Sequence, residues 1–191
     1  MKTVSILPYG VPAASSVCLL ASLVVLVSLP RVARAQMMVK VPEAGLTLQV
    51  PTGSTIVTRQ TPGALTKHSP GWVMDVIGPT EAGFRTNFNL RTGVAQPGAA
   101  YSLSSASKMS GQFRQGYPNS RNLTFTTLTV GGEKAVAVAG TIPMPKQVIR
   151  TKIVQFARAG TRYTFTFTSP ESAFYRHVGT FDKAVASIRW L

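Results

Sequence analysis

The chain has 191 residues, of which 45% are hydrophobic and only 14% charged, and this balance excludes a largely disordered protein. Twenty Lys and Arg residues against six Asp and Glu give a net charge of +14, so the surface is expected to attract anions. The single cysteine, Cys18, lies in the amino-terminal apolar segment, which excludes disulfides, thiolate metal sites and cysteine nucleophiles from the rest of the chain.

The first 35 residues have the features of an export signal. Lys2 gives a positive start, residues 17–29 (VCLLASLVVLVSL) form an apolar stretch, and a small-x-small sequence ends at Ala35. Because the stretch is shorter than the roughly 20 residues of a membrane-spanning helix, cleavage between Ala35 and Gln36 is favoured over a retained anchor. The expected mature form is one domain, residues 36–191, periplasmic or secreted and without a membrane span. It keeps 17 basic and six acidic residues, a net charge of +11.

Period-two patterns predict strands in the first half of the mature chain, separated by turns rich in Gly and Pro. The first strand stops at Pro51-Thr52-Gly53, and Ile56 and Val57 would continue it; an exposed loop is expected over residues 60–71. The predicted strands are 45–50 (GLTLQV), 72–77 (WVMDVI) and 84–90 (FRTNFNL), and residues 93–100 form the next connection.

Helical spacing begins at Ser102 and predicts one amphipathic helix. Gly111 weakens this helix by about 1 kcal/mol relative to Ala. Its apolar face is expected to carry Leu103, Ala106, Met109 or Ser110, Phe113 and Tyr117.

Two hairpins are predicted after this helix. Residues 123–130 and 133–142 reverse at Gly131-Gly132, and the adjacent Thr126 and Thr127 suggest a bulge in the first strand. Residues 147–157 and 162–168 reverse around residues 159–161. In the last strand the expected core face carries Tyr163, Phe165 and Phe167.

A closing helix is predicted from capping and periodicity. Ser169 suits the cap, Pro170 the first helical position, and Glu171 the positive end of the helix dipole. The core-facing positions are Phe174, Val178, Phe181, Val185 and Ile188, and the opposite, solvated face carries Arg176, His177, Asp182 and Lys183.

No catalytic or metal-binding motif stands out, so no cofactor and no enzymatic activity are expected. His68, His177 and six scattered acids have no ligand spacing, and His177 and Asp182 are expected at the surface. The sequence has no nucleophile elbow, carboxylate pair or phosphate loop. A hydrolase of unusual design remains an alternative, because a Ser-His-acid group is assembled in space rather than in sequence.

The one patterned charge feature is basic. Lys146, Arg150, Lys152 and Arg158 share the parity of one strand, and Arg162 opens the next strand. They could form an anion-binding stripe for envelope lipid, a cell-wall polymer or an acidic protein, or simply a solvated face or charged edge. The second interpretation is supported by Val148, Val154 and Phe156, which share this parity and must be buried. Nucleic acid is an unlikely partner, since the aromatic residues belong to the core pattern and export is expected.

The order of these elements resembles the PsbP-like superfamily of exported α/β domains (PsbP, DcrB and LpqN type). The opening residues 45–51 (GLTLQVP) are similar to the first strand of that family, and residues 163–190 are similar to its closing strand and helix. The resemblance implies an α+β fold with an antiparallel sheet sandwiched by helices. It also implies a non-enzymatic accessory or interaction protein, with an unknown protein or anionic envelope component as partner and an open oligomeric state.

Overall fold

The computed structural model describes residues 35–61, 70–97 and 101–191, all of which belong to one compact unit. Residues 1–34 of the predicted leader and His68 lie outside the described residues, as does most of the predicted loop 60–71. Neither helix in the described part is both long and apolar enough to cross a bilayer.

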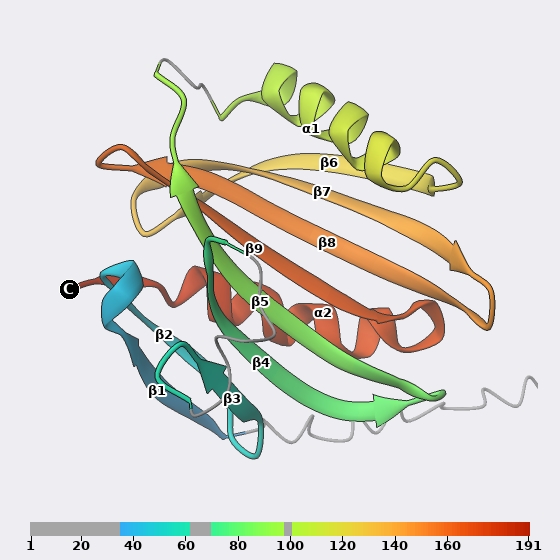
Figure 1. Cartoon of the computed structure of the whole chain (residues 1–191), viewed down its shortest axis with the longest axis horizontal. Coiled ribbons are helices and arrows are strands. Elements are labelled where there is room, and N and C mark those ends of the chain that lie inside the picture. The colour runs from blue at the N-terminus through green and yellow to red at the C-terminus, as the bar shows by residue number, and fades with distance from the viewer. Residues whose placement is uncertain (1–34, 62–69, 98–100) are drawn as a thin grey trace, which may run out of the picture. The chain divides into compact units, whose positions relative to one another are not determined.

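The core of the fold is a seven-stranded antiparallel sheet in the order β3-β4-β5-β9-β8-β7-β6 (Figure 1). Both predicted hairpins are confirmed, with reversals at Gly131-Gly132 and at Ala159-Gly160, where all four residues have positive φ. Gly at such positions avoids the steric cost of a side chain. The strands are β3 (Thr55–Thr58), β4 (Trp72–Glu81), β5 (Phe84–Val94), β6 (Arg121–Val130), β7 (Glu133–Met144), β8 (Gln147–Arg158) and β9 (Thr161–Pro170).

A second, three-stranded sheet has the order β1-β2-β10 and consists of β1 (Gln36–Val41), β2 (Leu46–Pro51) and β10 (Arg189–Trp190). A single 3₁₀ turn, η1 (Pro42–Ala44), joins its first two strands. The prediction that Ile56 and Val57 continue the first strand was wrong, because the chain turns at Gly53 and these residues pair with β4 in the large sheet.

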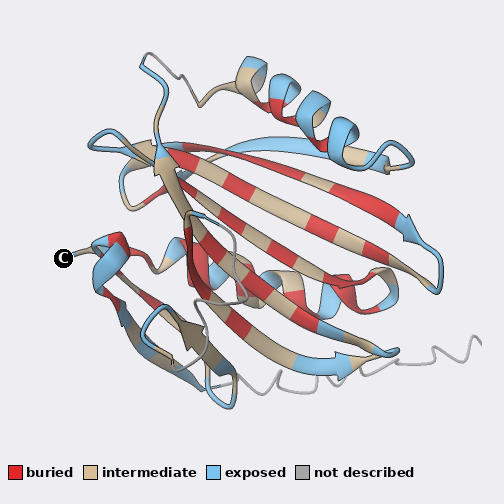
Figure 2. Ribbon diagram, in the orientation of Figure 1, coloured by how far each residue is buried: buried red, intermediate tan, exposed pale blue. Residues whose placement is uncertain are grey.

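One helix packs on each face of the large sheet. Helix α2 (Glu171–Ala186) and the small sheet lie on one face, and α1 (Leu103–Gly116) lies on the other over β6 and β7 (Figure 1). Strands β5, β8 and β9 of the large sheet alternate between buried and partly exposed residues (Figure 2). The predicted α+β architecture, an antiparallel sheet sandwiched by helices, is therefore confirmed.

The two faces have separate apolar cores of different size. The predicted aromatic face of β9 is confirmed: Tyr163, Phe165 and Phe167 are buried in the larger core, which lies between the large sheet, α2 and the small sheet. The smaller core, beneath α1, consists of Ala106, Met109, Phe113, Val136, Val138, Ile142 and Ile149.

The bulge in β6 lies elsewhere than predicted. The register shifts between Arg121 and Thr124, where Asn122 adopts a left-handed φ of 53°, whereas Thr126 and Thr127 pair regularly with β7. Since β6 is an edge strand with mostly exposed side chains, threonines are tolerated on both of its faces, and their adjacency carries no signal for a bulge.

The start of α2 was also predicted wrongly. Ser169 and Pro170 still belong to β9, where they pair with Arg150 and Ile149, and the helix begins at Glu171 without a side-chain cap. The sheet ladder takes precedence over the local capping signal. His177 was expected on the solvated face of this helix, but it is buried, because the end of β4 reaches over it.

Candidate functional site

The predicted basic stripe does not form one continuous surface. Arg150, Lys152 and Arg158 lie on the face of β8 that is turned toward α2, and each has an acidic neighbour. Lys152 Nζ is 2.6 Å from a carboxylate oxygen of Asp182, and Arg158 donates a hydrogen bond of 2.9 Å to Glu133. Acids within the fold therefore compensate these charges.

Arg150 is the most enclosed of the three. Its side chain is only 11% exposed, and its guanidinium carbon lies 5.2 Å from the ring centroid of Phe174 and 5.4 Å from that of Tyr175. The Glu171 carboxylate is 4.0 Å away. This stacked and partly paired arrangement holds α2 against the sheet and leaves little of the charge available to a ligand.

The other two predicted residues lie apart from these three. Lys146 is exposed in the two-residue turn between β7 and β8. Arg162 precedes the buried Tyr163 in β9 and therefore faces the opposite side of the sheet, the side that carries α1. The structure thus places the five residues in three locations.

Arg162 lies in a groove between α1 and the part of the sheet that α1 does not cover. The groove consists of two adjoining cavities of about 400 and 310 Å³, which share Gln112, Gln155 and Arg162 in their linings. Lys108 of α1 lines the larger cavity. Arg162 makes no ion pair with any residue in the described part of the chain.

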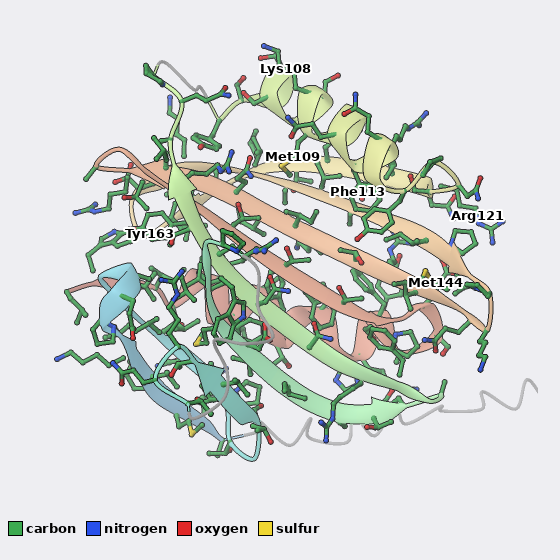
Figure 3. The ribbon with its side chains drawn as sticks, in the orientation of Figure 1. Lys108, Met109, Phe113, Arg121, Met144 and Tyr163 are labelled. Carbon is green, nitrogen blue, oxygen red and sulfur yellow. The ribbon has the colours of Figure 1, made fainter. Side chains whose placement is uncertain are left out.

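The groove has a polar floor and one partly buried phenol. Gln155 donates a hydrogen bond of 3.0 Å to the hydroxyl of Thr164. Burial raises the pKa of Tyr101, while the nearby positive charge of Arg162 acts in the opposite direction. Met109 borders the larger cavity, and beyond it Phe113 fills the space between helix and sheet (Figure 3). The groove is therefore the open end of the α1 interface.

Charge is distributed unequally between the two faces of the large sheet. Of the six acids, four are paired on the α2 side, Glu43 lies in η1 beside the small sheet, and only Asp75 points to the α1 side. Helix α1 contains no acid. The cations on the α1 side, assigned from strand parity and helix membership, are Arg85, Arg91, Lys108, Arg114, Lys134 and Arg162.

Parity could have revealed this face in the sequence. Residues 87, 89 and 91 of β5 and residues 164, 166 and 168 of β9 are all polar, while the positions between them are apolar. Two paired strands with matching polar faces indicate a surface that the core does not cover. The pattern of charges within any single strand does not reveal this face, because its charged residues come from several strands and from α1.

A second site lies at the opposite face, beside α2. His177 Nε2 is 2.8 Å from one carboxylate oxygen of Glu81, and Arg176 donates a hydrogen bond of 2.6 Å to the other. These hydrogen bonds lower the pKa of Glu81 below its usual value of 4.5. The ionised carboxylate accepts a hydrogen bond from Nε2, so this nitrogen carries the ring hydrogen.

The described residues contain no cluster of three or more His, Cys, Asp or Glu that could hold a metal ion. His177 and Asp182 do not converge, since Asp182 pairs with Lys152 instead. His177 and Ser54 line the same cavity, but no hydroxyl in the described part of the chain forms a hydrogen bond with the imidazole. The hydrogen-bonded His177–Glu81 pair could not have been predicted, because 96 positions separate the two residues.

No protein-family model and no curated protein matches the chain. Solved structures do match it. Cyanobacterial PsbP (CyanoP) from Synechocystis sp. PCC 6803 is 12% identical with a TM-score of 0.60, and the match covers 87% of this chain and 99% of that chain.

Two further structures extend the likeness. The Ran-binding protein Mog1p of Saccharomyces cerevisiae is 12% identical with a TM-score of 0.54, covering 83% of this chain and 96% of its own. LpqN of Mycobacterium tuberculosis, described as involved in cell envelope biogenesis, is 10% identical with a TM-score of 0.50, covering 81% and 89%. At these identities the likeness establishes the fold alone, and the chain has the PsbP-like α/β/α sandwich fold.

Proposed function

We propose that the chain is an exported, non-enzymatic interaction protein that holds an anionic partner against its α1 side. The segregation of charge carries this proposal: six cations and one acid face this side, whereas the cations of β8 are paired with acids on the other. Cations that outnumber the acids on one face attract anions, and a groove between them increases the effect. The partner would be an acidic protein, a cell-wall polymer or anionic lipid.

The fold supports a role in binding. Mog1p, which has this fold, is a Ran-binding protein, and LpqN is described as involved in cell envelope biogenesis. An interaction protein needs a stable scaffold and a surface that is not covered by its own core elements. The face around Arg162 is such a surface.

Two charge-reversal variants with the same change in net charge test the proposal. Lys108→Glu with Arg162→Glu alters the groove, whereas Lys40→Glu with Lys183→Glu alters exposed residues of β1 and α2. Binding to vesicles containing phosphatidylglycerol and to immobilised heparin is measured over a salt series. The groove variant should lose at least about tenfold in affinity at low salt, at about 1 kcal/mol per charge. Equal losses in both variants would show that only net charge matters.

The start of the fold supports export with cleavage after Ala35. The first strand begins at Gln36 and pairs with the end of β2, so the proposed mature form keeps every strand and both helices. Mass spectrometry of the protein recovered outside the cytoplasm should give an amino terminus at Gln36. A protein that retains residues 1–35 and sediments with membranes would support an anchor instead.

A hydrolase is the competing function, and the pair of His177 and Glu81 is the observation that favours it. Ser54 lines the same cavity and would be the nucleophile. Incubation of the mature protein with a panel of chromogenic esters tests this possibility. The proposal of a binding protein predicts no turnover above that of Ser54→Ala, whereas turnover abolished by Ser54→Ala would support the hydrolase.

A further inference from the structure

Strand β6 forms one edge of the large sheet, and no other strand in the described part of the chain pairs with its outer side (Figure 1). It has 10 residues, whereas β3 at the opposite edge has only 4. Edge strands usually avoid pairing with other chains by being short or by carrying charged side chains or proline. Residues 122–130 (NLTFTTLTV) contain neither a charge nor a proline, so this long edge is open to an added strand.

The backbone groups that point outward from β6 follow from the geometry of its hairpin. The two-residue turn makes Val130 and Glu133 a hydrogen-bonded pair, and such pairs alternate along an antiparallel ladder. The bulge of β6 precedes Thr124, and the register is regular from there to Val130. The residues whose N–H and C=O groups point away from β7 are therefore Phe125, Thr127 and Thr129.

The same stretch is accessible on both faces of the sheet. Residues 124–127 are all exposed, so neither helix covers them (Figure 2). Phe125 pairs with Val138 of the smaller core and therefore lies on the α1 side, where it is 46% exposed. An exposed aromatic side chain beside free backbone groups offers an apolar contact to a strand that pairs with β6.

Cations lie near both ends of this stretch on the α1 side. Helical periodicity places Arg114 on the side of α1 opposite to Gln112, which lines the groove, and thus on the side toward β6. At the other end, Lys134 pairs with Thr129 and shares its face of the sheet.

No acid balances these two cations from α1 or β6, because neither element contains one. Glu133, the acid next to Lys134, is already bonded to Arg158. The charges therefore favour an added segment with acidic residues rather than a second copy of this chain, whose residues 36–191 carry a net charge of +11.

We propose that β6 binds an extended, acidic segment of a partner protein, which adds an eighth strand to the large sheet. In this mode the main-chain hydrogen bonds supply affinity and alternate side chains supply specificity. The acidic character of the segment rests on the proposed function, whereas the open edge is independent of it. The groove lies on the Gln112 side of α1 and this edge on its Arg114 side, so the two sites flank one helix.

The test uses a decapeptide of alternating Glu and Val, added to the ¹⁵N-labelled mature protein. Binding should slow hydrogen exchange at the outward amides of Phe125, Thr127 and Thr129 by about tenfold or more. The inward amides of β6, which already bond to β7, should change much less. Slowing at inward and outward amides alike, or no binding of the peptide, would overturn the proposal.

A matched peptide separates strand addition from attraction between charges. It has the same sequence but carries N-methyl groups on two adjacent central residues, so that both of its edges are blocked. It should bind at least about tenfold more weakly, because several ladder hydrogen bonds are lost. Equal affinity of the two peptides would overturn strand addition. If heparin binding still depended on Lys108 and Arg162, the proposed function would stand without it.

A variant of β6 tests the edge from the side of the protein. Thr127→Pro removes an outward N–H but no hydrogen bond to β7, and proline is tolerated at such edge positions. It should weaken binding of the Glu-Val peptide by at least about tenfold. Thr126→Val, at a residue whose backbone faces β7, should bind the peptide as the parent does. Equal binding by both variants would contradict strand addition at β6.

A second copy of the chain is the other occupant that the experiment detects. Exchange of the same outward amides is measured without peptide at several protein concentrations. We expect no dependence on concentration, because the copies repel one another. Slowing that increases with protein concentration would assign the edge to a dimer and overturn the proposal of an acidic partner segment.

Discussion

Glu81 links the end of β4 to α2, because its two carboxylate oxygens form hydrogen bonds with Arg176 and His177 of α2. These hydrogen bonds lower its pKa below 4.5, so the folded state favours the ionised carboxylate. The resulting stabilisation is complete above about pH 4.5 and is lost as the pH falls through the lower pKa of the folded state.

Replacement of Glu81 by Gln should therefore change the response to acid. At neutral pH the variant is expected to be less stable by about 1 kcal/mol, because the pairs are partly exposed. Near pH 3 the difference from the parent protein should narrow. Urea unfolding at several pH values measures this difference, with Glu43→Gln as control, an exposed acid that forms no ion pair with any of the described residues. A constant difference across this range would contradict the assigned pairing.

Gly131 is fixed by a different contact, in which Trp190 Nε1 donates a hydrogen bond of 2.7 Å to its carbonyl. A Cβ at Gly131, where φ is 55°, would lie 2.8 Å from the same nitrogen, whereas one at Gly132 would meet no atom within 4 Å. Gly131→Ala should lower the free energy of unfolding by about 2 kcal/mol or more. Gly132→Ala should lower it by about 1 kcal/mol, from backbone strain alone. Equal losses of unfolding free energy in the two variants, measured by urea unfolding, would show that Trp190 can move away from a new Cβ without destabilising the protein.

At the scale of elements, α1 is held by a small core in which Phe113 is 4% exposed and packs beside Gly140 and Leu123. Phe113→Ala should destabilise the protein by about 3 kcal/mol and speed hydrogen exchange in α1. Tyr117→Ala, at the half-exposed end of the same helix, should cost about 1 kcal/mol or less. Similar costs for both would indicate that α1 is not anchored through Phe113.

The elements with their own periodicity could be predicted from the sequence: both hairpins, both helices and the aromatic face of β9. Strand β1 was missed, although it pairs with its neighbour β2. The two-residue strand β10 could not be predicted, because it is defined by pairing with β2 across the length of the chain. The end of β9 was misjudged for the same reason, since Ser169 and Pro170 carry a capping signal but are held by β8. Local patterns fail where long-range pairing decides.

The candidate site was the least predictable part. The alternation of side chains along β8 correctly placed Arg150, Lys152 and Arg158 on one face of the strand. It could not show that α2 brings two acids, Glu171 and Asp182, beside Arg150 and Lys152. Arg162 lies on the other face, where its neighbours come from α1 and β8. The position of a charge along one strand does not reveal which charges of other elements surround it.

At the scale of the whole molecule, we propose that the two faces of the large sheet have different tasks. The α2 face carries the larger core and nearly all the acids, so the cations of β8 are compensated within the fold. The α1 face carries six cations with Asp75 as its one acid, together with the groove at Arg162. Of the net charge of +11 on residues 36–191, six cations and one acid, +5, lie on this face, where we propose that they act on a partner.

Mapping an anion onto the surface tests this claim most directly. The ¹⁵N-labelled mature protein is titrated with a short heparin oligosaccharide, and the shifts of its backbone amides are followed at low and high salt. We predict shifts in α1, β5 and β9, around Lys108, Arg91 and Arg162, that disappear at high salt. Shifts centred on α2 and the small sheet, or spread evenly over both faces, would contradict a dedicated anion-binding face.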